Sequence, residues 1–289
     1  MTRILVIGGD SRTGSAIARA APDVTVVSRR GTRDDNKFVV DDYRSIPAEM
    51  FVGYNIVINC VGAVAGSDDD LAKANIETPV AIAKTAAAVG VEMFVQISSF
   101  SVFGAAPLIT SGQGPAPANS YGHSKLRAEQ ALQQLAQPDL KLAIVRFPML
   151  YGYGRSKLDD LLRLWLKLRF LPVPPGDVAR SMLHYDLAAQ FVLRLVQQGQ
   201  GGLFVAADPE PFSYRRVVDT LRPKAGVELH TLGVPEFALG IFRNVRPGLH
   251  ASLFEDSLLS PDANDLLQTG LESRLYTDIV RIARKIQDD

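Results

Sequence analysis

Tyr121 and Lys125 are the two residues of this chain whose types and spacing point most directly to chemistry. On a helix, residues four apart lie on the same face, one turn from each other. A free tyrosine keeps its proton up to a pKa of about 10, and a nearby ammonium group stabilises the phenolate and lowers that pKa. Such a pair can pass a proton to or from a substrate oxygen. Because this spacing also occurs in helices without any catalytic role, its meaning depends on the elements that position it.

Apolar segments alternate with helical segments through the first half of the chain. We expect strands at residues 3–7, 24–27, 38–43, 55–60 and 93–97, and helices at residues 15–21 and 71–89. This alternation predicts right-handed crossovers and a parallel α/β sheet, whose ligands bind at the carboxyl edge. Ser99 follows the fifth strand at that edge, and a helix at residues 121–134 carries Tyr121 and Lys125. We therefore expect Ser99 to lie near Tyr121 and to hydrogen-bond a substrate carbonyl oxygen.

A glycine-rich segment joins the first strand to the first helix. A strand, a tight turn and a helix N-terminus present N–H groups and the helix dipole to a pyrophosphate. Ser11 stands where the middle glycine of the dinucleotide-binding fingerprint is usual, and its hydroxyl can donate to the pyrophosphate. The predicted phosphate-contacting residues are Gly8, Ser11, Arg12, Thr13 and Gly14. An ordinary tight strand–helix turn is the alternative interpretation.

The segment after the second strand indicates which dinucleotide binds. NAD-binding proteins place an Asp or Glu on the ribose hydroxyl about twenty residues after the first glycine. Ser28, Arg29 and Arg30 occupy this region, and two cations with a hydroxyl suit a 2′-phosphate. NADP(H) is therefore the preferred cofactor, NAD(H) is the alternative, and a solvated charged turn is the interpretation without a cofactor. Asp42 can accept a hydrogen bond from the adenine amino group.

The composition bears on the partners of the protein. The chain has 289 residues, of which 47% are hydrophobic, and this fits one large domain or two unequal ones. Lys and Arg together number 31, as do Asp and Glu, so the net charge predicts no nucleic-acid partner. The N-terminus has no signal-peptide layout, and no apolar run approaches the length of a membrane span. We therefore predict a cytoplasmic protein without a membrane partner or metal site, with its single cysteine, Cys60, as a small buried residue.

The ordered set of motifs resembles the extended short-chain dehydrogenase/reductases, the NAD(P)-dependent epimerase/dehydratase group that acts on nucleotide sugars. The resemblance covers nearly the whole chain. It rests on residues 8–14, 42–44, 59–62, 98–104, 121–125 and 146–152, together with Asn75.

This resemblance implies a role for each matching residue. It implies a catalytic triad of Ser99, Tyr121 and Lys125, in which the lysine also holds the nicotinamide ribose. Further cofactor contacts are implied for Asp42, Tyr43, Val61, Gly62 and Asn75. Substrate contacts are implied for Ser99, Phe100, Met149 and Arg180. The resemblance also implies a homodimer through the helices that begin near residues 71 and 121.

The departures from the family pattern reduce the number of reactions that the chain is expected to catalyse. Met149 stands where the family usually has an Asn that contacts the nucleotide diphosphate of the substrate. Phe100 and Ser101 stand where nucleotide-sugar 4,6-dehydratases carry an Asp and a Glu. Removal of water from the sugar then has no evident acid–base catalyst, so we set the dehydratase reaction aside.

The second half of the chain is expected to bind the substrate. We predict a Rossmann-type doubly wound parallel sheet at residues 1–147 and a small C-terminal substrate-binding cap at residues 148–289, with part of 181–207 returning to the first domain. The amphipathic helix at residues 157–170 is interpreted as packing on its own domain rather than lying on a membrane. Arg180 resembles the family arginine that binds the substrate diphosphate, because a guanidinium pairs bidentately with phosphate; a surface charge is the alternative.

These features support four functional hypotheses. The first is NADPH-dependent reduction of a 4-keto group on a nucleotide-diphosphate sugar, favoured by Arg29 and Arg30. An NAD-dependent 4-epimerase with the same triad is the alternative. A non-catalytic dinucleotide-sensing protein is disfavoured by the intact Tyr–Lys pair. Reduction of another small carbonyl compound is supported by Met149 in the diphosphate position.

Overall fold

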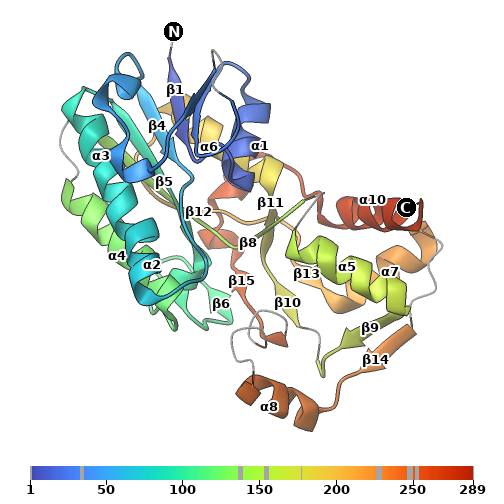
Figure 1. Ribbon diagram of the computed structural model, residues 1–289. Coiled ribbons are helices and arrows are strands. Elements are labelled where there is room, and N and C mark those ends of the chain that lie inside the picture. Colours follow the sequence, from blue (N-terminus) through green and yellow to red (C-terminus); the bar gives the residue numbers. More distant parts are fainter. Residues whose placement is uncertain are drawn as a thin grey trace. The chain divides into compact units, whose positions relative to one another are not determined.

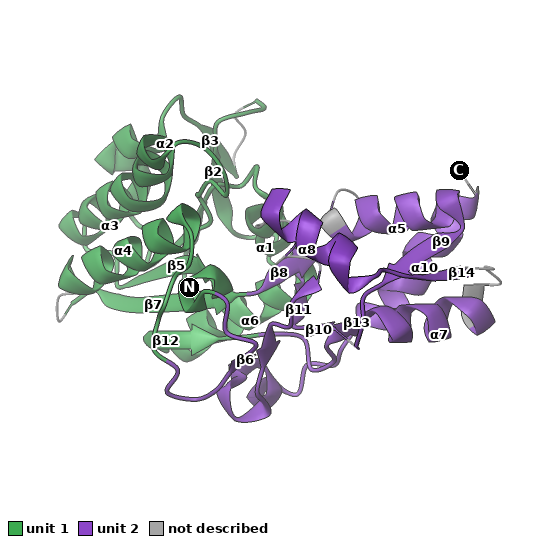
Figure 2. Ribbon diagram, turned by 90° about the horizontal axis from the view of Figure 1, so that it is seen from below, with its two compact units in different colours: residues 1–104, 114–147, 185–206 green, residues 105–113, 148–184, 207–289 purple. Residues whose placement is uncertain are grey.

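The computed structural model describes residues 2–32, 36–135, 139–152, 156–176, 178–225, 230–245, 250 and 254–288. The chain divides into two compact units, coloured separately in Figure 2. Unit 1 comprises residues 1–104, 114–147 and 185–206, and unit 2 comprises residues 105–113, 148–184 and 207–289. Each unit is therefore built from segments that lie far apart in the sequence.

Unit 1 is built on a parallel sheet, which has seven strands within the described residues, in the order β12-β7-β5-β4-β1-β2-β3. The strands are β1 (Ile4–Ile7), β2 (Thr25–Ser28), β3 (Lys37–Val39), β4 (Ile56–Asn59), β5 (Met93–Ser99), β7 (Lys141–Phe147) and β12 (Gly202–Val205). The order of the sheet reverses beside β1, as in doubly wound dinucleotide-binding sheets. The predicted Rossmann-type α/β fold is confirmed.

Helices cover both faces of this sheet. α1 (Arg12–Ala20) packs against α6 (Tyr185–Gln198), and α3 (Thr78–Ala88) packs against α4 (Ser120–Leu135). Figure 1 shows the two pairs on opposite faces of the sheet. The central strands are accordingly apolar and buried, as a parallel sheet covered on both faces requires.

The predicted helix at residues 71–89 is interrupted. α2 (Asp68–Ala72) and α3 are separated by the π-helical turn η3 (Lys73–Glu77). Thr78 donates both its N–H and its hydroxyl to the carbonyl of Lys73, five residues earlier, with a hydroxyl distance of 2.8 Å. Pro79 follows and has no N–H for a regular helical bond. The sequence pattern predicts one continuous helix because apolar spacing does not reveal such an inserted residue.

Short segments also differ from the sequence-based expectation. The third strand is β3 and ends before the predicted acids, because Asp42 caps the 3₁₀ turn η1 (Tyr43–Ser45) by accepting from the Arg44 N–H at 2.9 Å. The predicted loop at 148–154 contains a strand, β8 (Met149–Tyr151). The remaining 3₁₀ turns are η2 (Ala48–Phe51), η4 (Phe100–Phe103), η5 (Pro261–Ala263) and η6 (Asp265–Thr269).

Unit 2 combines helices with short strand pairs. Its described helices are α5 (Lys157–Leu168), α7 (Tyr214–Ala225), α8 (Glu236–Val245) and α10 (Leu275–Asp288). In the described part, β10 (Ala179–Arg180) pairs with β13 (Phe212–Ser213), β11 (Met182–His184) with β8, β14 (His230–Gly233) with β9 (Phe170–Val173), and β15 (Leu258–Leu259) with β6 (Leu108–Ile109).

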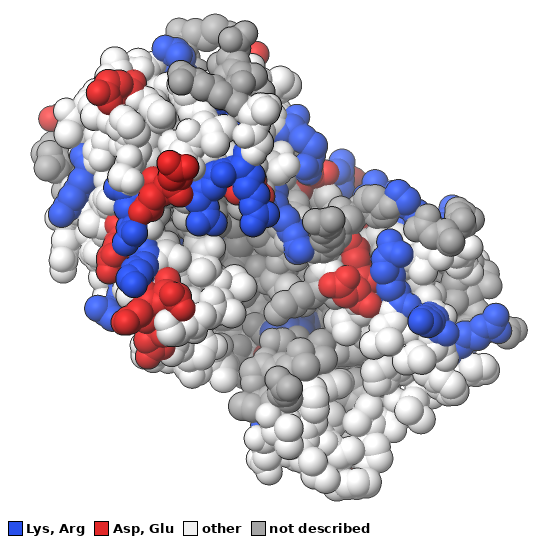
Figure 3. Space-filling model, in the orientation of Figure 1, with Lys and Arg blue, Asp and Glu red and all other residues white. Residues whose placement is uncertain are grey.

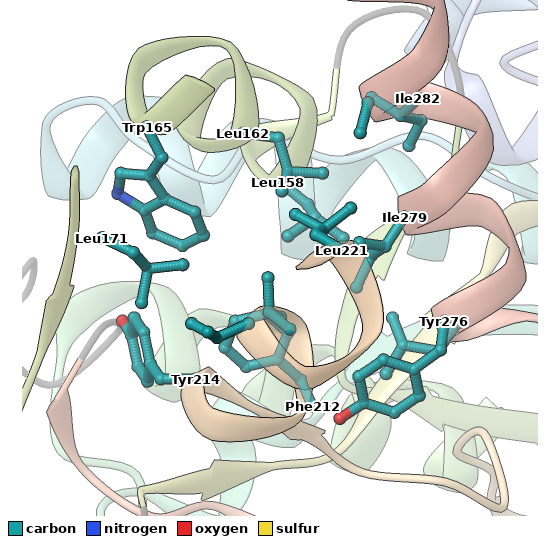
Figure 4. Packing of buried hydrophobic residues seen from close by; sticks show 14 of the residues in the cluster. Leu158, Leu162, Trp165, Leu171, Phe212, Tyr214, Leu221, Tyr276, Ile279 and Ile282 are labelled. Carbon is teal, nitrogen blue, oxygen red and sulfur yellow. The ribbon is translucent and has the colours of Figure 1, made fainter. Parts of the chain in front are cut away.

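The core of unit 2 lies between three of its helices. Figure 4 shows Leu162 and Trp165 of α5 facing the region that contains Leu221 of α7 and Ile279 of α10. All four side chains are at most 4% exposed. The amphipathic helix α5 therefore buries its apolar face in its own unit, which agrees with the packing interpretation of the sequence.

The surface shows no dominant sign of charge on the face drawn in Figure 3, where basic and acidic side chains lie interspersed. Among the described residues, no helix has the length and hydrophobicity that crossing a membrane requires. The same residues contain no group of three or more His, Cys, Asp or Glu side chains arranged to hold a metal ion.

Candidate active site

The turn between β1 and α1 has the backbone shape of a phosphate site. Gly8 has a φ of 88°, and a side chain on Gly14 would collide with the carbonyl oxygen of Gly8. Both positions therefore require glycine. Ser11 has a φ of −75° and a ψ of 157°, an extended conformation that any residue adopts, and its Oγ accepts from the Gly14 N–H at 3.0 Å. Ser11 thus caps α1, and a middle glycine is not required by the backbone conformation.

This turn fits the diphosphate of a dinucleotide. N–H groups in the first turn of a helix have no acceptor inside the helix, and the helix dipole makes that end positive. Ser11 satisfies the N–H of Gly14, which leaves those of Arg12 and Thr13 for an anion. The first turn of α1 contains no acid that would repel a phosphate. The residues present are therefore suited to the cofactor that the glycine pattern implies.

Two residues predicted to contact the cofactor, Tyr43 and Ser28, are buried and contact the glycine-rich turn. Tyr43 is 6% exposed, and its hydroxyl donates to Asp10 Oδ1 at 2.6 Å. Burial and the Asp10 carboxylate raise the pKa of Tyr43. Ser28 is 1% exposed within β2, and its Oγ lies against Gly9. Tyr43 and Ser28 therefore pack against residues of the glycine-rich turn.

The charged residues around this turn differ in whether another charged side chain pairs with them. The carboxylate of Asp42 pairs with the guanidinium of Arg44 at 2.8 Å, and hydrogen bonds from Arg44 lower the pKa of Asp42. Arg29 lies 5.4 Å from the centre of the Tyr43 ring, and both Arg29 and Arg30 are exposed after the end of β2. Asp42 must share its oxygens with Arg44, whereas the two arginines present their charges to solvent.

Ser99, Tyr121 and Lys125 come together around the last residues of β5. Ser99 ends β5, and Tyr121 and Lys125 lie in the first two turns of α4. The Ser99 hydroxyl donates to Ser101 Oγ at 3.2 Å, and it lies close enough to the Tyr121 hydroxyl to lower the pKa of that phenol. Lys125 is 4% exposed, and its Nζ donates to the carbonyl of Ile97 at 2.7 Å. The carboxyl edge of the sheet therefore carries two neighbouring hydroxyls and a buried ammonium.

Burial dominates the acid–base properties of this group. It raises the pKa of Tyr121, and the hydrogen bond with Ser99 opposes that rise. Burial also lowers the pKa of Lys125 to about 8, and the nearby Glu129 charge opposes this shift. Burial thus moves the pKa of Tyr121 upward, in the direction opposite to the lowering that the sequence predicts from Lys125. Tyr121 is therefore protonated at neutral pH.

Asn75 holds the loop after β4 against α4. Its Oδ1 accepts from the Ala63 N–H at 2.8 Å, and its Nδ2 donates to the Ala63 carbonyl at 2.8 Å and to Ser124 Oγ at 2.9 Å. Asn75 is 0% exposed and uses its amide in these bonds. It thus acts as a support for the loop that contains Val61 and Gly62, beside which Lys125 lies.

Glu129 is a residue of this site that sequence reasoning missed. Its carboxylate accepts from Ser98 Oγ at 2.5 Å and from the Arg146 guanidinium at 2.6 and 3.1 Å. Glu129 and Arg146 are 2% and 4% exposed, and together they connect α4 to the ends of β5 and β7. Glu129 lies one turn beyond Lys125, so extending the Tyr–Lys spacing by four residues is the signal that identifies it.

Comparisons with known proteins identify the family of this chain. The model of the NAD dependent epimerase/dehydratase family matches residues 4–207. The chain belongs to this family. UDP-glucose 4-epimerase of Vibrio cholerae is 26% identical over 205 residues, which cover 65% of this chain and 62% of the relative. The chain spans between 26% and 62% of the lengths of its curated relatives.

Solved structures of related enzymes share the fold. UDP-glucuronic acid 4-epimerase of Bacillus cereus, solved with NAD, has a TM-score of 0.78 at 16% identity, covering 99% of this chain and 97% of the other. A dTDP-4-dehydrorhamnose reductase of Clostridium acetobutylicum has a TM-score of 0.72 at 21% identity, covering 99% of both chains. Epimerases and reductases thus have the same architecture, which does not distinguish between the two reactions.

The four substrate-contacting residues predicted from the family pattern divide between the units. Ser99 and Phe100 belong to unit 1, where Phe100 is 7% exposed and packs edge-to-face on Phe103 at 5.9 Å. Met149 and Arg180 belong to unit 2. Met149 packs against the core of that unit, and the Arg180 guanidinium donates to the Glu255 carbonyl. Burial lowers the pKa of Arg180.

Proposed function

We propose that this member of the epimerase/dehydratase family catalyses the NADPH-dependent reduction of a 4-keto group on a nucleotide-diphosphate sugar. The observation that carries the proposal is the meeting of Ser99, at the end of β5, with Tyr121 and Lys125 of α4, where the Lys125 ammonium donates to the Ile97 carbonyl at 2.7 Å. In this proposal the turn at residues 8–14 binds the cofactor diphosphate, and Arg29 and Arg30 bind its 2′-phosphate. Arg180 of unit 2 binds the substrate diphosphate.

The side chains of the site divide the proton chemistry between them. NADPH, when bound, supplies the hydride that the carbonyl carbon receives. Ser99 donates a hydrogen bond to the carbonyl oxygen and stabilises the negative charge that develops there. Tyr121 gives its proton to that oxygen, which leaves an alcohol and a phenolate. The Lys125 ammonium stabilises the phenolate.

Glu129 is proposed to position this machinery. It hydrogen-bonds Ser98, the residue before Ser99, and it lies one turn beyond Lys125 on α4. Its ion pair with Arg146 is almost fully buried, so this pair and the bond to Ser98 hold α4 against β7 and β5.

An NAD-dependent 4-epimerase is the second candidate, supported by the 26% identity with UDP-glucose 4-epimerase of Vibrio cholerae. An epimerase first oxidises the sugar, for which Tyr121 must begin as a phenolate. The same triad serves both reactions, and the cations of Arg29 and Arg30 after β2 are what favour reduction with NADPH. No observation supports a non-catalytic sensor, since Ser99, Tyr121 and Lys125 are all present. Met149 continues to favour a different small carbonyl substrate as the third candidate.

The test of this proposal begins with the cofactor. The purified protein is denatured, the released nucleotide is identified by mass spectrometry, and NADPH and NADH are titrated separately. We expect no retained NAD and at least about tenfold tighter binding of NADPH. The double variant Arg29→Ala/Arg30→Ala should lose that preference while binding NADH as the unaltered protein does. Tightly retained NAD would assign the chain to the epimerases, and NADPH selectivity leads to a screen of nucleotide 4-keto sugars.

A further inference from the structure

We propose that unit 2 contains a second binding site, for a small organic anion with an apolar body. The site is a cavity of about 820 Å³ lined by residues of α7 and of the carboxyl ends of β9 and β14, all within unit 2. Figure 1 labels these three elements. Ser99, Tyr121, Lys125 and Arg180 do not line it. The inference is therefore independent of the proposed reduction.

The cavity arises from the way in which two parallel strands end. β9 and β14 pair in register up to Val173 and Gly233. Pro174–Gly176, Val234 and Pro235 follow these strand ends and line the cavity, and the Val234 N–H donates to the Val173 carbonyl at 3.0 Å. A side chain added at Gly233 would meet nothing within 4 Å, so space opens beside the last strand residue. Proline residues restrict the backbone on both sides, so the walls are largely formed in advance of binding.

One face of α7 forms the opposite wall. Arg215, Asp219 and Arg222 recur at intervals of four and three residues, so they lie on one side of the helix with Val218 between them. Val218 is 6% exposed and gives the wall an apolar base, whereas the two arginines are exposed. A helix face that combines a buried apolar residue with exposed cations suits a ligand that has an apolar part and a negatively charged group.

The two cavity arginines, Arg215 and Arg222, differ from their neighbour Arg216 in their contacts. Within the part of the chain that the structure describes, neither Arg215 nor Arg222 forms an ion pair or a side-chain hydrogen bond. The neighbouring Arg216 differs, since it pairs with Glu210 at 3.1 Å and lies 4.3 Å from the centre of the Tyr276 ring. Arg216 therefore has a structural partner, and the two cavity arginines have charge and donors available for a ligand.

These features define the class of ligand. Guanidinium groups pair bidentately with phosphate and with carboxylate, so the ligand carries one of these groups. Val173, Val218 and Val234 line the cavity and favour an apolar body over a bare ion. The volume falls within the roughly 300–1,000 Å³ typical of small-molecule sites. Asp219 lies between the two arginines, and its negative charge weakens the binding of an anion. Removing that charge by substitution therefore tests whether the ligand is an anion.

Three probes distinguish the chemistry: phenyl phosphate, benzoate and phenol, each titrated into the full chain by isothermal calorimetry. We expect the two anions to bind and phenol not to bind, with the tighter anion identifying phosphate or carboxylate as the preferred group. The variant Arg215→Ala/Arg222→Ala should weaken binding at least about tenfold, and Asp219→Asn should strengthen it a few-fold, about threefold. Arg243→Ala, an exposed arginine of α8, is the matched control and should change nothing.

Two results would overturn the proposal. One is the absence of any binding that the double variant weakens, with the fold of that variant verified by circular dichroism. The other is loss of binding in Arg180→Gln with retention in Arg215→Ala/Arg222→Ala, since the probes would then occupy the substrate site. NADPH turnover should be retained in the double variant, which separates this test from that of the proposed reaction.

Discussion

The two units bury their interiors in different ways. In unit 1, neighbouring strands of one parallel sheet are connected by crossovers, and helices cover both faces. In the described part of unit 2, strands pair two by two, and β6 is paired with β15 through Leu108 and Leu258, which lie far apart in the chain. In unit 1 most paired strands follow one another along the chain, with β1–β4 and β7–β12 as exceptions, whereas β6 and β15 of unit 2 come from remote segments.

The buried polar groups of the two units differ as well. In unit 1 the carboxylate of Glu129 is paired with a guanidinium, that of Arg146, at 2.6 Å. In unit 2 the carboxylate of Asp208 accepts from the Tyr151 hydroxyl at 2.7 Å, and burial raises the pKa of Asp208. A buried ion pair needs both partners, so removal of either charge of the Glu129–Arg146 pair should be costly; unit 2 has a buried contact of its own between His184 and Asp278, at 3.2 Å.

The largest effect is expected from Tyr121→Phe in unit 1. The variant lacks the proton donor, so turnover should fall by roughly 10²–10⁴-fold, while NADPH affinity stays within about twofold. Steady-state rates and cofactor titration measure the two quantities. Tyr54→Phe, a change at another buried tyrosine of the same unit, should keep its rate. A Tyr121→Phe enzyme with a near-normal rate would show that the proton comes from another group.

Glu129→Gln tests the buried ion pair that connects α4 to β5 and β7. The change leaves the Arg146 charge buried without its partner, so the free energy of unfolding should fall by about 3–5 kcal/mol. Urea unfolding measures the loss. Glu77→Gln is the control, because the Glu77 side chain is 55% exposed and lies 3.6 Å from Arg44. An exposed ion pair of this kind contributes about 0–1 kcal/mol to the free energy of unfolding. Equal losses in the two variants would contradict the importance given to burial.

Leu162→Ala tests whether the core of unit 2 can be weakened without affecting unit 1. Leu162 is 0% exposed, so its truncation should lower the free energy of unfolding by about 2–5 kcal/mol. NADPH affinity, measured below the unfolding transition, should stay within about twofold, because unit 1 supplies the proposed cofactor contacts. Leu164→Ala on the same helix, 49% exposed, should cost less than about 0.5 kcal/mol. A parallel loss of NADPH affinity in Leu162→Ala would show that the units are energetically coupled.

The smallest effect concerns the pH dependence of unit 1. Burial lowers the pKa of Lys125 from 10.5 to about 8, so above pH 8 the unfolded chain binds more protons at this residue than the folded chain does. The free energy of unfolding therefore rises with pH from this source, by roughly 1 kcal/mol between pH 7 and 9. Burial raises the pKa of Cys60 to about 12 and acts in the opposite direction above pH 9. The measurement is thus the difference between the unaltered chain and Lys125→Met at pH 7 and 9; a difference that does not change with pH would contradict the prediction.

The sequence by itself determined the fold class and the order of the elements in unit 1. Apolar segments of strand length alternate with helical ones, and the chirality of crossovers then limits the topology. The same order brings Ser99 to the carboxyl edge beside the helix of Tyr121 and Lys125, so the site could be anticipated from local patterns. Gly8 and Gly14 were identified because only glycine fits a left-handed turn and a close backbone approach.

Tertiary structure decided the features that depend on contacts between distant segments. The direction of the pKa shift of Tyr121, the bond from Tyr43 to Asp10 and the pair of Glu129 with Arg146 all follow from burial, which no local pattern reports. The strand pairs of unit 2 and the cavity beside α7 likewise join remote segments. Sequence periodicity describes which face of an element is apolar; the free energy of burying particular groups together depends on which other element that face meets.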